Sequence, residues 1–171
     1  IANTADYWHE IINKIQNIAV KETRLGIPVL YGIDAIHGAT YTKGSTLFPQ
    51  AISMAATWNT EIAKQSGEIT SLETKASGIA WNYYPVMDIG RQPLWSRLWE
   101  TFGEDVYLAS QMGASYIKGA QGDDMSAPNK LATCLKHYVG YSFPINGLDR
   151  TPAWISERMM REYFLPTFEA G

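Results

Sequence analysis

Residues 85–105 read PVMDIGRQPLWSRLWETFGED and carry the clearest structural signal in the chain. A short apolar run ends at Asp88, and two arginines, two tryptophans and three further acids follow it. Charged groups and aromatic faces directly after an apolar strand are poorly suited to a plain core, and they favour a polar pocket at a strand end. Such a combination suits a small polyhydroxylated ligand.

Two other apolar runs end in the same way. The run PVLYGID (28–34) ends at Asp34, and a third run at 131–135 is followed by Lys136 and His137. A strand is also expected at 81–87, before Asp88. Apolar residues at helical spacing, with capping residues at their ends, predict helices at 6–24, 59–76 and 105–119, and a last helix opening at Thr151 and interrupted by Pro166.

Helices therefore alternate with strands, which predicts an α/β fold with parallel β/α units. Three strands cannot close a barrel, and a (β/α)8 barrel needs about 250 residues. We expect residues 1–171 to form one partial domain, roughly the first half of a TIM barrel. A small doubly wound sheet is the alternative, although no GxGxxG or Walker loop supports a nucleotide site.

The composition narrows the possible partners. The 171 residues carry a net charge of -3, which argues against nucleic acid, and the apolar runs are too short to span a bilayer. Cys134 is the single cysteine, and the three histidines are spread along the sequence, so we expect no disulfide, no metal site and no cofactor. The sequence leaves the localisation open, and a periplasmic or secreted protein is compatible with it.

In a parallel barrel the carboxyl ends of the strands form the ligand site, which makes three residues candidates for binding. Asp34 can accept hydrogen bonds from sugar hydroxyls, or it can bond nearby backbone amides as a loop residue. Lys136 and His137 are both donors. Adjacent strand residues point to opposite faces, so both reach a pocket only at a bulge or at the strand end.

Arg97 is the fourth candidate because its guanidinium offers a fork of donors. The structural alternative is an Arg–Glu bridge, to Glu100 or Glu104, with the tryptophans packed beneath the loop. Asp88, Arg91 and Glu104 are expected to brace the loop and to support the residues that contact the ligand. For Asp88, direct contact with the ligand is an equal alternative.

Four ordered motifs and a C-terminal segment resemble the N-terminal barrel domain of glycoside hydrolase family 3, the β-glucosidase-like enzymes. They are RLGIPVLYGIDAIHG (24–38), TLFPQAISMAATWN (46–59), PVMDIGRQPLWSRLWETFGED (85–105), LATCLKHYVGYS (131–142) and REYFLPTFEAG (161–171). The resemblance implies that Asp34, Arg97, Lys136 and His137 bind the sugar in the first subsite. The segment RQPLWSR departs from the family's Asp-Pro-Arg-Trp-Gly-Arg pattern. KHYVGYS lacks the Pro-Gly-His-Gly continuation of the N-acetylglucosaminidase branch, which favours a glucosidase or xylosidase.

The same resemblance implies that the bond-breaking groups lie elsewhere. Family members retain configuration, with a nucleophilic Asp in a Ser-Asp-Trp-like motif and an acid/base Glu in a later domain, and neither has a matching position here. The chain is therefore expected to be part of a retaining exo-acting β-glycosidase, truncated before the nucleophile motif and lacking the later barrel strands and the C-terminal domain. Its expected partner is an oligosaccharide or β-glycoside.

Two other functions stay open. The chain could be a non-catalytic sugar-binding or structural domain that pairs with the missing barrel half, or with a copy of itself, through its open sheet edges. It could also be an unrelated α/β enzyme with a phosphate ligand, in which Arg97 and Lys136 bind the anion.

Overall fold

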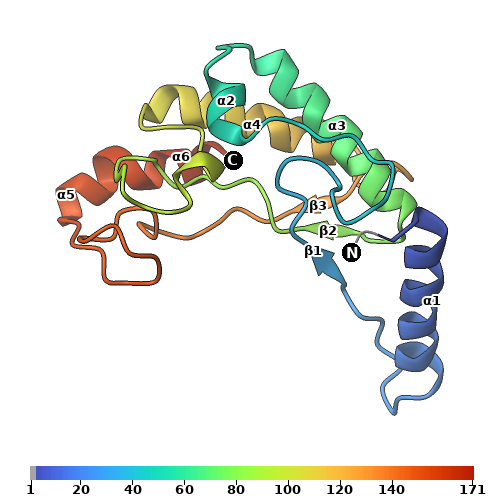
Figure 1. The fold of residues 1–171 in the computed structure, drawn as a ribbon. Helices are drawn as coiled ribbons and strands as arrows, with labels where there is room; N and C mark the ends of the chain where they lie inside the picture. The colour runs from blue at the N-terminus through green and yellow to red at the C-terminus, as the bar shows by residue number, and fades with distance from the viewer. Residues whose placement is uncertain (1–2) are drawn as a thin grey trace.

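The computed structural model describes residues 3–171 and contains a three-stranded parallel sheet (Figure 1). The strands are β1 (Gly32–Ile33), β2 (Trp81–Asn82) and β3 (Ala132–Thr133), in the order β1-β2-β3. Gly32 pairs with Trp81, and Trp81 pairs with Ala132, so the three strands are level with one another. Their carboxyl ends therefore meet at one edge of the sheet.

Helices alternate with the strands, which confirms the predicted α/β organisation. They are α1 (Ala5–Lys21), α2 (Ala51–Ala55), α3 (Thr60–Ala76), η1 (Leu98–Glu100), α4 (Val106–Gln121), α5 (Glu157–Met159), η2 (Met160–Phe164) and α6 (Leu165–Ala170). In Figure 1, α2, α3 and α4 lie above the sheet, while α1 extends away at one end and α5 and α6 lie at the other. Within residues 3–171 no helix is both long and apolar enough to cross a membrane.

Two predicted helix starts are confirmed. Both were predictable because a capping side chain bonds a backbone N–H only two or three residues further along the chain. The Asn59 side chain accepts a hydrogen bond from Glu61 N at 3.1 Å and begins α3. Asp105 accepts one from Leu108 N at 2.7 Å and begins α4. Each cap satisfies a backbone N–H that has no partner within its helix. The first helix, expected over 6–24, ends earlier, at Lys21.

The strands are shorter than predicted, because extended chain becomes a strand only where a neighbour pairs with it. Past β2 and β3 the pairing continues as single contacts: Val86 bridges Lys136, and Met87 N donates to Lys136 O at 2.8 Å. Before β1, Leu30 is exposed. Each outer strand has one neighbour among the described residues, so its other edge is open.

The last helix begins later than predicted. The Thr151 hydroxyl donates to Leu148 O at 2.6 Å and closes a turn, and Ser156 instead caps the helix from Glu157 onward. Pro166 does not end this segment, because it lies in the first turn of α6, where a missing N–H costs little. The short helix α2 was not predicted.

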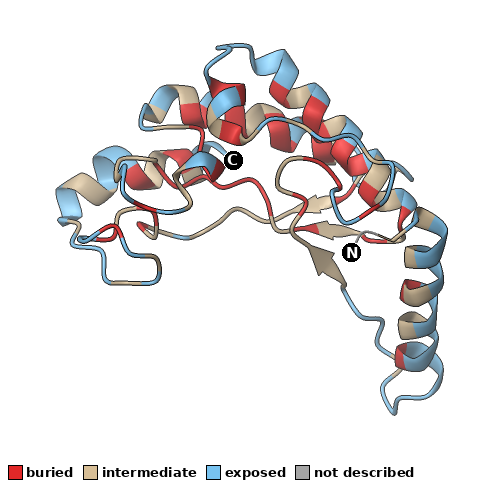
Figure 2. Cartoon of the chain, viewed as in Figure 1, coloured by how far each residue is buried: buried red, intermediate tan, exposed pale blue. Residues whose placement is uncertain are grey.

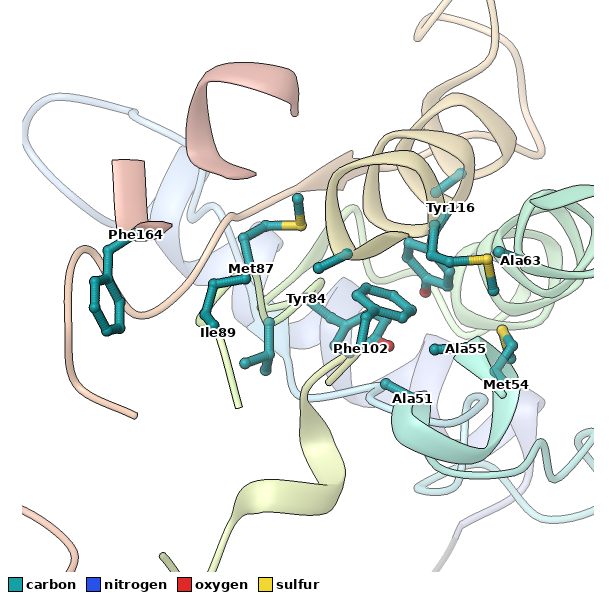
Figure 3. Packing of buried hydrophobic residues seen from close by; sticks show 14 of the residues in the cluster. Ala51, Met54, Ala55, Ala63, Tyr84, Met87, Ile89, Phe102, Tyr116 and Phe164 are labelled. Atoms are coloured by element: carbon teal, nitrogen blue, oxygen red, sulfur yellow. The ribbon is translucent and has the colours of Figure 1, made fainter. Parts of the chain in front are cut away.

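The core lies between the sheet and the helices above it. Figure 3 shows Tyr84 and Met87, from the chain after β2, packed with Phe102 and with Tyr116 of α4. Figure 2 shows buried residues along α3 and α4, whereas α1 is mostly exposed or intermediate. The chain after β2 therefore runs through the core, and this packing fixes the position of Asp88 and the polar loop that follows it.

Close approach of α3 and α4 depends on two glycines. A Cβ on Gly67 would overlap Tyr116 O, and a Cβ on Gly119 would overlap Lys64 O. Both obstacles are backbone atoms, which cannot rotate away. The contact therefore requires hydrogen in place of a side chain at each position.

Gly119→Ala is expected to lower the free energy of unfolding by about 1–3 kcal/mol, measured in urea. Alanine favours a helix by up to about 1 kcal/mol over glycine, so overlap with Lys64 has to outweigh propensity. Gln111→Ala, on the exposed side of α4, is the control and should change stability by less than about 0.5 kcal/mol. An unchanged Gly119→Ala protein would show that the two helices are not in tight contact.

Candidate active site

Polar residues from all three strand ends line one cleft of about 610 Å³. Asp34 follows β1, Arg97 lies in the loop after β2, and Lys136 and His137 follow β3. The level register of the strands causes this convergence, because the parallel strands end at the same edge. The structure thus brings together the four side chains proposed from the sequence to bind ligand.

An ion pair joins the ends of the two outer strands. Lys136 Nζ donates a hydrogen bond to Asp34 Oδ1, and the Lys136 side chain is only 14% exposed. The Asp34 side chain is more exposed, at 45%. A sugar hydroxyl beside this pair can donate to the carboxylate and accept from another N–H of the ammonium group. Lys136 and His137 both line the cleft because β3 has already ended at Thr133.

Asp88 supports the site from behind. Its side chain is fully buried, and Oδ2 accepts hydrogen bonds from the backbone N of His137 at 2.6 Å and from its Nδ1 at 2.8 Å. Asp88 is absent from the lining of the cleft. Of the two roles considered for it, the geometry fits bracing rather than contact with ligand.

Arg97 is held on several sides. Its Nε and Nη2 atoms each donate to Glu100 at 2.7 Å, forming a two-pronged ion pair. Nη2 also lies 3.2 Å from His137 Nε2, and Nη1 lies 3.4 Å from the Tyr141 hydroxyl. Hydrogen bonding to Glu100 raises the pKa of the guanidinium, so the charge is permanent. The Arg–Glu bridge considered from the sequence is therefore present, and Arg97 faces the cleft as well.

One of the two tryptophans packs beneath the loop, as in the structural alternative considered from the sequence, whereas Trp99 is exposed. Trp95 is buried and donates through Nε1 to Asp149 at 2.9 Å, so its face is not offered to a ligand. Tyr141 lines the cleft instead, with its ring centroid 5.5 Å from that of Trp95. Hydrogen bonds from Tyr141 and then Trp95 lower the pKa of Asp149. Tyr141 and Arg150 also line the cleft, and neither was among the candidates from the sequence. Only the position of Tyr141, four residues after His137, could have indicated it.

Arg91 and Glu104 do not line this cleft. They border a separate open groove of about 640 Å³, where the Arg91 guanidinium lies 4.4 Å from the ring centroid of Tyr163. His37 bonds Phe48 O at 3.1 Å, as expected for a loop residue. No group of three or more potential metal ligands gathers within residues 3–171.

This geometry coincides with a family match over nearly the whole chain. Residues 4–171 match the model described as the glycosyl hydrolase family 3 N terminal domain. The chain belongs to this family. The lysosomal beta glucosidase of Dictyostelium discoideum is 51% identical over 167 residues, which cover 94% of this chain and 20% of that protein. A beta-xylosidase of Formosa agariphila is 35% identical over 95% of the chain and 23% of its own length.

A solved structure supports the same assignment. The beta-glucosidase of Listeria innocua in complex with isofagomine superimposes with a TM-score of 0.89 at 30% identity, over 95% of this chain and 22% of that protein. The chain therefore spans about a fifth of the length of the relatives it matches. The family match covers the segments that carry the four cleft residues.

Glu100→Ala is expected to lower the free energy of unfolding by about 1–3 kcal/mol, because it leaves Arg97, which is 24% exposed, without its main partner. Glu157→Ala is the matched control. It breaks an ion pair with Arg161 in which both side chains are more than two-thirds exposed, so its expected cost is below about 1 kcal/mol. Equal losses in urea denaturation would contradict a special role for the Arg97–Glu100 pair.

Proposed function

We propose that this chain forms the N-terminal part of a retaining, exo-acting β-glycosidase and that its cleft holds the terminal non-reducing sugar of a β-glycoside. The main support for this proposal is that one cleft is lined by Asp34, Arg97, Lys136 and His137. Family membership supports the proposal, as do relatives that are named as β-glucosidases and a β-xylosidase.

The architecture of the complete protein is part of the proposal. Three parallel strands with their helices correspond to roughly the first half of a (β/α)8 barrel, and the open outer edges of β1 and β3 are where further strands would pair. Residues 1–171 are then one partial domain. The later strands and a C-terminal domain complete a protein of the relatives' length.

The chemistry divides between this chain and the rest of the protein. Retaining hydrolysis needs a nucleophile and an acid/base about 5 Å apart. The cleft carboxylates here are already engaged, Asp34 by Lys136 and Glu100 by Arg97. They therefore suit sugar binding, and we assign the nucleophile and acid/base to later parts of the protein. Each cation of the cleft faces a carboxylate, Lys136 and Arg97 as above and Arg150 at 3.7 Å from Asp149, which also leaves little net positive charge for a phosphate ligand.

In this proposal the cleft residues act by fixing hydroxyls. Asp34 accepts from them, while Lys136 and Arg97 donate. Such bonds accelerate the reaction only insofar as they strengthen when the sugar ring distorts toward the transition state. Losing one should therefore reduce kcat as well as raise KM.

Asp34→Ala in the full-length protein is expected to lower kcat/KM for an aryl β-glucoside by about 10- to 100-fold. A hydrogen bond to a charged group contributes about 1.5–3 kcal/mol, and each 1.4 kcal/mol is a factor of ten. Asp124→Ala is the control, since Asp124 is an exposed loop carboxylate that bonds Ser126, and it should leave kcat/KM unchanged. Full activity of Asp34→Ala would refute the role assigned to this residue.

A second function is favoured by the open sheet edges and by apolar residues beside them. Leu25, Ile27 and Leu30 are each 62% exposed just before β1. A non-catalytic, sugar-binding or structural domain that associates through these edges would account for that exposure. Light scattering on the purified 171-residue chain should then report a dimer. Hydrolysis of an aryl glucoside by that chain above background would rule this function out.

A further inference from the structure

We infer that Asp88 is a positioning residue that sets the tautomer of His137 and, through it, the orientation of Arg97 in the cleft. This inference rests on the proposed function of the cleft. Asp88 does not line the cleft, yet it is hydrogen-bonded to His137, which does. His137 in turn contacts Arg97, so the three side chains form one continuous path from the core to the cleft.

The protonation of His137 follows from its two neighbours. The Arg97 guanidinium has only N–H donors, so the atom facing it, His137 Nε2, must accept. A neutral imidazole that accepts at Nε2 carries its proton on Nδ1. Nδ1 lies 2.8 Å from the Asp88 carboxylate, which is an acceptor. Both contacts therefore require the same form, neutral His137 with the proton on Nδ1.

This form limits which Arg97 donors remain for a ligand. Of its five N–H groups, two donate to Glu100 and one to His137. One of the two on Nη1 points toward the Tyr141 hydroxyl at the longer distance of 3.4 Å. The guanidinium thus presents Nη1 to the cleft, and His137 serves as an acceptor rather than a donor. His137, expected from the sequence to be a donor, thus accepts from Arg97 in this arrangement.

The substitution Asp88→Asn separates positioning from charge. The same oxygen, Oδ2, accepts from the backbone N–H of His137 and from Nδ1. The backbone group is always a donor, so it holds the amide oxygen of the substituted side chain in that place and keeps the proton of His137 on Nδ1. Leucine has a similar size and offers no acceptor. Asp88→Asn therefore keeps the acceptor for the Nδ1 proton without the charge, and its amide nitrogen takes the place of Oδ1, which has no hydrogen-bond partner among the described residues. Asp88→Leu removes both the acceptor and the charge.

The test compares Asp88→Asn and Asp88→Leu in the full-length protein with an aryl β-glucoside. We expect kcat/KM to stay within about threefold of wild type for Asp88→Asn and to fall about 100-fold for Asp88→Leu, as expected for a misplaced binding group. Asp105→Ala is the control for lost stability, because it removes the α4 cap outside the cleft. It should lower the melting temperature and leave kcat/KM unchanged.

Equal losses in the two Asp88 variants would assign the effect to charge and overturn the inference, as would wild-type activity in both. If Asp88→Leu does not fold, ¹⁵N NMR of histidine-labelled wild-type protein decides, with the His137 signals assigned by their loss in His137→Gln. We expect a protonated Nδ1 and an unprotonated Nε2; the reverse would overturn the inference. A wild-type protein without β-glycosidase activity would refute the proposed function and leave this spectroscopic test in force.

Discussion

Level parallel pairing of three short strands is the constraint on which the site depends. Because Gly32, Trp81 and Ala132 are in register, the chain leaves β1, β2 and β3 at one edge of the sheet. The buried Asn82 side chain reinforces this edge: its oxygen accepts from Ala35 N at 2.8 Å, and its amide donates to Ala35 O at 3.0 Å. A shift of one strand by one residue would separate the cleft residues, which come from segments far apart in the sequence.

The cleft is held by paired charges before any ligand arrives. Lys136 faces Asp34, and Arg97 faces Glu100. The buried carboxylate of Asp88 holds His137 from the core side. Each pairing offsets the cost of partly burying a charge, and each leaves polar atoms directed at the cleft. A site arranged in this way spends less of its binding energy on ordering its own side chains.

Much of this arrangement was predictable, because an apolar run that ends in a polar residue is a local pattern. That pattern indicated Asp34 and the Lys-His pair, and local capping groups indicated two helix starts. The rest depended on how loops fold over the sheet. The aromatic rings that line the cleft belong to tyrosines, and Arg91 and Glu104 border another groove. Thr151 closes a turn instead of starting a helix. Spacing along the sequence does not determine these directions, because they depend on partners far away in the chain.

The most direct test is a crystal structure of the full-length protein with isofagomine, the ligand bound by the Listeria innocua relative. We expect the ring to lie in this cleft, hydrogen-bonded to Asp34, Lys136 and Nη1 of Arg97, while the bonds from Arg97 to Glu100 and from His137 to Asp88 stay intact. A ring bound elsewhere, or one that contacts none of these three side chains, would refute the binding role proposed for the cleft.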